Sequence, residues 1–370
     1  MLRVELWTTE TVETAKLGFP ARMTAIINRL ATAVPNCDFE EDYRAWAMRQ
    51  LEGRREAKLY ARMSERSGID HRWSVLSEKD ARLDEGDGFY SAEAPSTAQR
   101  MMIYAEEAPK LALAAIRKLG ELGQITHIVV ASCTGFVAPG IDQIIARRLG
   151  LADDVERILI GFMGCYAAVT ALRTARHIVR SEPQARVLVV TVELSTLHHQ
   201  QTVDIEPLLA GAQFGDGAAA AIVSGSGMGL SIGTGIAAAL EESDQLITWQ
   251  IGDTGFKMRL SGKVPGRISA ALKRDDVRKR VLGDGEKPAV YAVHAGGRSI
   301  LDAVAEGLEL DEHSLDHSRM VLRDFGNMSS STLMFVLDRF MQDRPESGVA
   351  LAFGPGLAME GFRFEWCDAL

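Results

Sequence analysis

Short apolar runs recur along this chain, and longer amphipathic stretches separate them. Val, Ile and Ala dominate the strands predicted at Ile125–Ala131, Arg186–Val192 and Gly217–Ser224. Helical spacing of apolar residues predicts helices over Thr97–Leu119 and Ile141–Leu149. Continuous apolar strands that alternate with helices are typical of a sheet covered by helices on both faces. The pattern therefore predicts an α/β fold.

Further elements complete the first half of the chain. Glycine, proline and asparagine mark the breaks between them. The expected elements are an irregular leader at residues 1–20, a strand at Met23–Ala33, a helix capped by Asp38 that ends near Leu51, a buried strand at Arg157–Gly164, and a long helix from Tyr166 to Arg180.

The second half partly repeats this order, so we expect two similar α/β units, residues 1–226 and 227–370. No Pro/Ser-rich linker divides them, which favours two halves packed as one body. The expected elements of the second half are strand-like Gly229–Leu240, a strand or hairpin at Thr248–Leu260, a helix at Ile268–Leu282, a strand at Ala289–Val293, a helix at Arg298–Leu308, a short apolar run at Met320–Leu322, a helix at Ser330–Met341, and strands at Val349–Phe353 and Gly361–Trp366.

Composition and charge narrow the function classes. The 370 residues are 46% hydrophobic and 25% charged, with a formal net charge of −9. A negative chain does not favour nucleic acid or an anionic membrane as a partner. No apolar run reaches the ~18 residues of a membrane span. The first residues carry acids and no apolar segment of the kind found in secretory signals, so we expect a cytoplasmic protein.

Cysteine usage agrees with that expectation. The four cysteines are widely spaced and form no CxxC pair. This pattern suits a reducing compartment and argues against a zinc site and against a disulfide scaffold. We expect neither a metal nor an organic cofactor.

One cysteine stands at a position suited to nucleophilic chemistry. In GFMGCYAAVTALRTARHIVR, Cys165 lies between a predicted strand and a long predicted helix. The unpaired N–H groups and the dipole at a helix N-terminus favour thiolate over thiol. Gly161 and Gly164 leave room for a sharp turn and for a ligand close to the backbone. This arrangement is suited to acyl transfer.

The second half carries two matching candidates, His294 and Asn327, at predicted strand-to-helix junctions. If the halves are related by a pseudo-twofold axis, these junctions converge on Cys165. A Cys–His pair would form a thiolate–imidazolium ion pair. The imidazolium and the Asn327 amide would then donate to an oxyanion or to the enolate left when a malonyl group loses CO2.

Each of these residues also has a structural interpretation. Cys165 alone is also consistent with a small apolar core residue. Cys133, in ASCTGF, also ends a strand, but Gly135, Pro139 and Gly140 separate it from the next helix, whereas a helix follows Cys165 at once. A lone histidine is more often structural, and a lone asparagine is more often a cap. The three residues together favour catalysis.

Other features are compatible with a thioester substrate. Lys58, Arg62 and Arg66 recur every four residues on one helix face, where they would either contact phosphates or form a solvated basic face. Phe214 precedes a Gly-Asp-Gly turn at Gly215–Gly217 and is either a core residue or a gate beside the thiol. The turn lacks phosphate-loop spacing.

The motifs GFMGCYA, AQFGDGAAA, VHAGGRSILDAV, DFGNMSSST and AFGPG, in this order, resemble the chalcone and stilbene synthase family, the type III polyketide synthases. The resemblance covers about Met23 to Trp366. It implies a thiolase-like fold with two duplicated α/β halves in five layers (αβαβα), and a homodimer. It also implies iterative decarboxylative condensation of malonyl-CoA onto a CoA-linked starter, followed by cyclisation to a small aromatic polyketide or a pyrone.

The resemblance assigns roles to individual residues. Cys165 resembles the acyl-bearing nucleophile, and His294 and Asn327 resemble the pair that polarises the thioester carbonyl and stabilises the enolate. Phe214 resembles the gatekeeper between the CoA tunnel and the cavity. The residues that resemble the CoA-binding set are Lys58, Arg62 and Arg66.

Departures from the plant pattern affect the substrate cavity. The sequence has His294-Ala295 where plant members usually have His-Pro, and the terminal glycine loop opens with Ala352. Trp249 falls where plant chalcone synthases keep a glycine, and an indole there would shrink the cavity. The chain is therefore similar to bacterial-type members. The residues expected to line the elongation cavity are Cys133, His198, Trp249 and Met258.

Three other functions are considered for the same fold. A ketoacyl-carrier-protein synthase III would also use Cys, His and Asn, but the segments after His294 and around Asn327 resemble the polyketide family more. Hydroxymethylglutaryl-CoA synthase is disfavoured because no match to its additional glutamate is found. A catalytically inactive binding subunit would be expected to lack one of the three residues.

Overall fold

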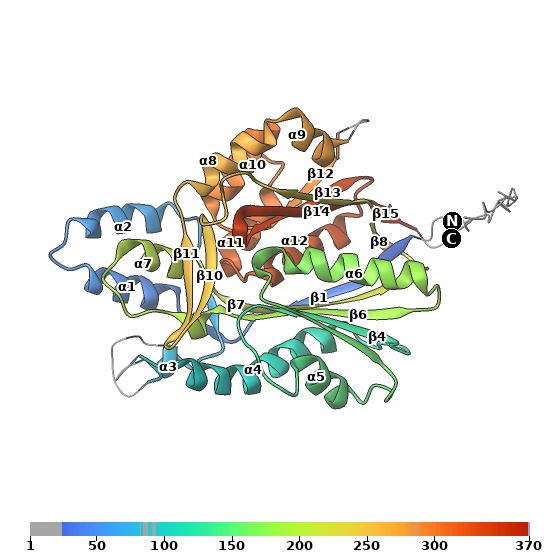
Figure 1. Ribbon diagram of the computed structural model, residues 1–370, viewed down its shortest axis with the longest axis horizontal. Helices are drawn as coiled ribbons and strands as arrows, with labels where there is room; N and C mark the ends of the chain where they lie inside the picture. Colours follow the sequence, from blue (N-terminus) through green and yellow to red (C-terminus); the bar gives the residue numbers. More distant parts are fainter. Residues whose placement is uncertain are drawn as a thin grey trace, which may run out of the picture.

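The computed structural model describes residues 24–81, 83, 88–90, 94–283, 285 and 287–368. The leader expected at residues 1–20 lies outside this part of the chain. Two β-sheets lie one above the other with helices between them, as Figure 1 shows.

The larger sheet has seven strands in the order β15-β8-β1-β7-β6-β4-β5. β4 pairs in parallel with both β5 and β6, and the remaining pairs are antiparallel. The strands of this sheet are β1 (Ala25–Ala33), β4 (His127–Ser132), β5 (Glu156–Gly161), β6 (Arg186–Leu194), β7 (Asp216–Ser224), β8 (Gly229–Ile232) and β15 (Trp366–Cys367).

The smaller sheet has the order β12-β13-β14-β9, in which only β12 and β13 pair in parallel. Its strands are β9 (Gly235–Ala239), β12 (Val290–Val293), β13 (Gly348–Gly354) and β14 (Ala358–Phe364). β8 and β15 follow residue 226 in sequence yet join the larger sheet, and the expected boundary between residues 226 and 227 stays a prediction.

Helices complete the layers (Figure 1). α6 (Ala167–Ser181) and α12 (Ser330–Asp343) lie between the sheets, with α4 (Thr97–Lys118) and α5 (Ile141–Leu149) on the outer face of the larger sheet. The helices over the smaller sheet are α8 (Val264–Leu272), α9 (Asp275–Leu282) and α10 (Arg298–Leu308). α11 (Asp316–Phe325) packs beside α12 and against β12, at the edge of this sheet. This arrangement confirms the predicted five-layer thiolase-like fold.

The residue composition of α6 and α12 explains why these helices lie between the two sheets. A helix between two sheets must be apolar on opposite faces, unlike a surface helix with one apolar stripe. In α12 the first eight residues, Ser330 to Leu337, are all buried, and α6 buries a series of alanines that lets both sheets approach closely. The central layer thus forms one continuous hydrophobic core between the sheets.

Smaller elements frame the region beside α4. They include a two-stranded hairpin that Figure 1 shows as a separate ribbon next to the main sheets. These elements are α1 (Glu40–Gln50), α2 (Glu56–Glu65), α3 (Glu78–Ala81), α7 (Ile205–Gly211), the pair β2 (Cys37–Asp38) and β3 (Trp73–Ser74), the hairpin β10 (Ile247–Gly252) and β11 (Gly255–Leu260), and the 3₁₀ turns η1 (Gly164–Tyr166), η2 (Ser195–His198) and η3 (Pro355–Leu357).

Two helix predictions were wrong. The stretch Ile268–Leu282 forms two helices, α8 and α9, because the chain leaves helical geometry at Arg274, whose ψ is 133°. Asp38 lies in β2 and is not the N-cap of α1, which is Phe39; the Asp38 carboxylate still accepts a hydrogen bond from the Glu40 N–H at 3.2 Å.

Two expectations about strands were also wrong. The strand-to-helix junction predicted at Asn327 joins two helices instead, because the apolar run Met320–Leu322 lies inside α11. The strand before Cys165 was expected to be buried, but β5 is an edge strand whose Ile158 and Leu159 are 37% and 42% exposed. Burial of an edge strand depends on its neighbours in the sheet, and the local sequence carries no information about them.

Among the described residues, no helix combines the length and the apolar character needed to cross a bilayer.

Candidate active site

Cys165 lies in the turn η1, directly before α6. Gly164 has φ +69°, and a Cβ on it would lie 2.3 Å from Pro355 Cδ, so only glycine fits this turn. The turn leaves the thiol 9% exposed at the N-terminal end of α6, as the sequence predicted.

His294 and Asn327 face the same region from the second half. The backbone N–H of His294 donates to the Leu351 carbonyl at 2.8 Å, which anchors it beside β13. Within the described part of the chain, neither ring nitrogen of His294 has a hydrogen-bond partner. Both nitrogens are therefore available to a bound molecule.

The Asn327 amide is held from both sides. Its Nδ2 donates to the Gly296 carbonyl at 3.2 Å, and its Oδ1 accepts from the Ser329 N–H at 2.8 Å. These two contacts fix which end of the amide is the donor. A fixed donor of this kind can stabilise a developing negative charge without reorganising.

The catalytic candidates all lie at one cavity of about 30 Å³. Cys165, His294 and Asn327 all line it, together with Phe214 and Met258. The structure therefore brings together the three residues that the sequence singled out, Cys165 from the first half of the chain and His294 and Asn327 from the second.

Burial controls the protonation of the thiol and the imidazole. Burial raises the pKa of Cys165 to about 12, and hydrogen bonds from Ser329 and Asn327 only partly oppose this rise. Burial lowers the pKa of His294 to about 3. Burial thus favours the neutral form of both groups and opposes the predicted thiolate–imidazolium pair. Desolvation outweighs the field of the helix N-terminus.

Phe214 is coupled to Asn327 through the backbone. The Asn327 N–H donates to the Gln213 carbonyl at 2.8 Å, and the Gly215 N–H donates to the Asn327 carbonyl at 3.0 Å. Movement of the phenylalanine segment would therefore disturb the asparagine directly.

A buried arginine that the sequence analysis missed supports this segment. Arg72 is fully buried and donates from Nη1 to the carbonyls of Gly211 (2.6 Å) and Phe214 (2.9 Å). Its Nε pairs with the buried Glu40 carboxylate, and its guanidinium lies 4.6 Å from the Tyr43 ring centroid. The Arg72–Glu40 pair looks like ordinary surface charge in the sequence, so no local signal marks it.

Three of the residues expected to line the elongation cavity, Cys133, His198 and Met258, lie around the fourth, Trp249. The Trp249 indole donates to the Cys133 carbonyl at 2.9 Å and lies edge-on to the His198 ring, with centroids 5.6 Å apart. Cavities of about 20 and 40 Å³ flank the indole, and Met258 lines both. Phe214 lines both of these cavities and also the cavity of about 30 Å³ at Cys165.

Cys133, the rival nucleophile, is held by a buried carboxylate. The Cys133 N–H donates to the Glu193 carboxylate at 3.0 Å, and its Sγ lies 3.3 Å from the same group. Burial, with the negative charge of Glu193 added, raises the pKa of the Cys133 thiol well above its usual value. Glu193 was missed too; a lone acid in the apolar strand VTVEL is the signal that would have found it. These contacts favour Cys165 as the nucleophile.

The basic residues predicted on α2 lie at a larger cavity of about 400 Å³. Arg62 and Arg66 line it, whereas Lys58 is exposed one turn away and does not. Gln213 and Gly297 line this cavity, and their neighbours Phe214 and Gly296 line the one at the thiol. The Phe214 segment therefore lies between the two cavities.

Three side chains of types that bind metal ions form a cluster away from Cys165. His127 Nε2 lies 3.7 Å from a carboxylate oxygen of Glu156 and of Glu182, at the N-terminal end of β4. Both glutamates are more than half exposed. Cys133 follows the other end of β4, so this cluster is separate from the site.

Comparison with known proteins agrees with this geometry. Residues 13–227 match the N-terminal domain of chalcone and stilbene synthases, and residues 231–365 match the C-terminal domain. The chain belongs to the chalcone and stilbene synthase family. The resemblance carried by the five motifs is confirmed.

Individual relatives are similar over nearly the whole chain. The alpha-pyrone synthesis polyketide synthase-like Pks18 of Mycobacterium tuberculosis is 30% identical, over 94% of this chain and 92% of that protein. The crystal structure of PKS-I from the brown alga Ectocarpus siliculosus has a TM-score of 0.83 and 28% identity, over 94% of this chain and 100% of the other. The 1,3,6,8-tetrahydroxynaphthalene synthase of Streptomyces coelicolor, a bacterial type III polyketide synthase, has the same TM-score and identity over 93% and 100%.

These similarities show that the chain is a type III polyketide synthase of bacterial type, an acyltransferase. The alternative of a ketoacyl-carrier-protein synthase III is not favoured.

Proposed function

We propose that this enzyme loads a CoA-linked starter onto Cys165 and extends it with malonyl-CoA, with His294 and Asn327 as its catalytic partners. The observation that carries the proposal is the cavity that Cys165, His294 and Asn327 share. The Phe214 segment separates it from an arginine-lined cavity. The substrates are CoA thioesters, and no metal or organic cofactor takes part.

In the loading step, Cys165 sulfur attacks the thioester carbonyl of the starter. Because burial favours the neutral thiol and the neutral imidazole before binding, His294 accepts the thiol proton as the carbon–sulfur bond forms. The bond to the CoA sulfur breaks, and the same proton leaves with CoA as its thiol. The Asn327 amide donates to the oxyanion of the tetrahedral intermediate.

In the extension step, malonyl-CoA loses CO2 and leaves the electron pair as an enolate. The thioester oxygen carries the negative charge and accepts hydrogen bonds from Asn327 Nδ2 and from His294. The enolate carbon then attacks the acyl group on Cys165, so a carbon–carbon bond forms and the thiolate is released. A dry cavity protects the enolate from protonation by water.

The size of the cavities bears on the product. A cavity of 20 to 40 Å³ has room for only a few water molecules. Such space favours few extensions, followed by closure of an enol oxygen onto the thioester carbonyl, which yields a pyrone and frees the sulfur. The name of the mycobacterial relative, which refers to alpha-pyrone synthesis, supports this product class.

The edge strand β5 supports a homodimer. Its Ile158 and Leu159 are exposed, and Phe136 nearby is 44% exposed. An exposed apolar edge strand offers unpaired N–H and C=O groups and favours association with another strand. We therefore propose that two copies pair along this edge, and that the enzyme works in the cytoplasm.

The test is incubation of the purified protein with malonyl-CoA and a panel of acyl-CoA starters. We expect CO2 release and pyrone formation, both lost in Cys165→Ala. Absence of CO2 and of any polyketide from the whole panel would refute the proposed function. Retained starter loading in Cys165→Ala would move the nucleophile to Cys133.

A further inference from the structure

The helix at the mouth of the arginine-lined cavity exposes apolar side chains. On α2, Leu59 and Met63 are 42% and 45% exposed, and both line the cavity of about 400 Å³. They lie one helical turn apart, so they form a single apolar strip on the helix surface. Methionine is common at surfaces that bind other proteins because it adapts its shape.

Basic residues flank this strip along its length. Residues 52–66 contain five cations and three carboxylates, although the whole chain has a formal net charge of −9. In the part of the chain that the structure describes, Arg54, Lys58, Arg62 and Arg66 form no side-chain ion pair, while Arg55 pairs with Glu56 at 3.0 Å. The ten residues of α2 span about 15 Å, which is longer than the contact surface of one phosphate group.

The basic surface continues past the cavity at the N-terminal end of α2. Arg54 and Arg55 are exposed and line neither this cavity nor the one at the thiol. They are therefore not placed to hold the phosphates of a CoA molecule inside the cavity. Their position favours a partner larger than CoA.

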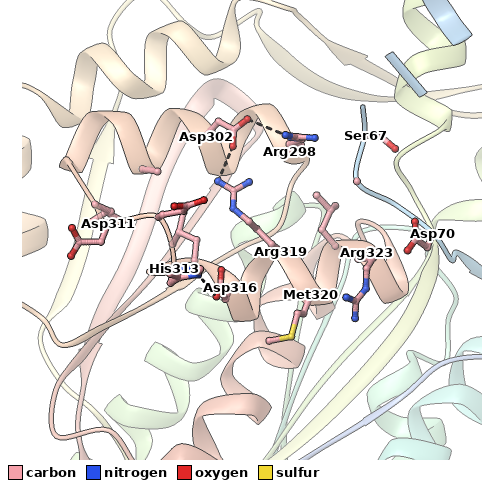
Figure 2. Close-up of a pocket in the computed structure, with 16 residues that line it drawn as sticks. Ser67, Asp70, Arg298, Asp302, Asp311, His313, Asp316, Arg319, Met320 and Arg323 are labelled. Carbon is pink, nitrogen blue, oxygen red and sulfur yellow. Dashed lines mark hydrogen bonds and ion pairs between the residues drawn. The ribbon is translucent and has the colours of Figure 1, made fainter. Parts of the chain in front are cut away.

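The opposite side of the mouth carries charges of both signs, many of them in ion pairs. Figure 2 shows the neighbouring cavity of about 690 Å³, which shares Arg298 and Asp302 with the first one. Asp302 pairs there with Arg319 at 2.7 Å, and Asp311 and Asp316 lie further along. Because these acids and bases largely cancel, this side attracts an anionic partner less than the cations of α2 that form no ion pair among the described residues.

We propose that this surface, residues 54–66, binds an acidic acyl carrier domain that delivers a starter on its phosphopantetheine arm. The inference rests on the proposed function. The arm is the part that such a carrier shares with CoA, so the path to Cys165 serves both donors. Charge complementarity draws an acidic partner to the basic helix, and Leu59 and Met63 supply apolar contact.

The transfer needs no further reactant. The Cys165 sulfur forms a bond with the acyl carbon, the bond to the pantetheine sulfur breaks, and the thiol proton of Cys165 ends on the pantetheine sulfur. The carrier leaves with a free thiol.

The experiment compares three octanoyl donors by acylation of Cys165: octanoyl-CoA, octanoyl-pantetheine and the octanoyl form of a bacterial fatty-acid acyl carrier protein. We expect the carrier to load Cys165 at least about tenfold faster than octanoyl-pantetheine at equal concentration. Transfer from the carrier no faster than from pantetheine would overturn the proposal. Failure of octanoyl-CoA to load would instead refute the proposed function.

A charge-reversed variant localises the surface. Arg54→Glu/Arg55→Glu should lower carrier-dependent loading about tenfold and leave CoA-dependent loading within about twofold. Arg147→Glu/Arg148→Glu, on exposed positions of α5, is the matched control and should change neither. Equal loss with both donors in the first variant, or equal loss of carrier loading in both variants, would contradict docking on α2.

Discussion

Trp249 separates the space around the thiol into small cavities. Its truncation should therefore change the length of the polyketide that the enzyme makes. The indole walls the cavities of about 20 and 40 Å³, and the third, of about 30 Å³, shares Phe214 and Met258 with them. In Trp249→Ala these cavities should join. We expect products with at least one more malonyl unit, and a change of at least about tenfold in the ratio of longer to shorter products.

The Trp249→Ala substitution should also lower the free energy of unfolding. A fully buried Trp→Ala change costs about 3–5 kcal/mol, and Trp249 is only half-buried, so we expect about 2–3 kcal/mol. This loss includes the hydrogen bond to the Cys133 carbonyl, worth about 1 kcal/mol. Urea unfolding measures this change and shows whether the variant is folded in the assay.

The assay uses malonyl-CoA with one acyl-CoA starter and identifies products by mass spectrometry. Trp249→Phe is the control, because it removes the N–H but keeps most of the ring, and it should keep the wild-type products. An unchanged product distribution from folded, active Trp249→Ala would refute the role of the indole as a size limit.

Three further predictions concern protonation, assembly and packing. Because the Cys165 pKa is raised to about 12, its alkylation by iodoacetamide should become about tenfold faster per pH unit between pH 7 and 9, and a plateau below pH 7 would reveal a standing thiolate. Ile158→Asp/Leu159→Asp should convert a dimer to a monomer in light scattering, and a wild-type monomer would contradict pairing along β5. Glu40→Ala should destabilise the fold by about 3–5 kcal/mol in urea unfolding because it leaves Arg72 buried without its partner, and a loss below about 1 kcal/mol would show that the ion pair is dispensable.

Much of the fold could be predicted because local signals agreed with the topology. The bounds of α5 and α10 match the expected helices, and α5 ends at Gly150 with φ +64°, a glycine position at a helix end. The apolar runs of β6 and β7 were also recognisable because both strands are buried on both faces. Where the burial of an element agrees with its apolar periodicity, the sequence is sufficient to predict its type and its position.

The errors arose where distant neighbours decide the outcome. β5 looks like a buried strand, but it lies at a sheet edge that nothing in this chain covers within the described residues. The Cys165 pKa was expected to fall, yet desolvation by the surrounding core raises it. Arg72 and Glu193 are buried charges that have no periodic signal, so only the three-dimensional arrangement reveals their contacts with the site.

The most direct measurement separates loading from decarboxylation in Asn327→Ala. Peptide mass spectrometry after incubation with an acyl-CoA starter should find the acyl group on Cys165, with loading reduced far less than CO2 release from malonyl-CoA. An acyl group on Cys133, or CO2 release at the wild-type rate, would contradict a site in which the sulfur carries the chain and the amide stabilises the enolate.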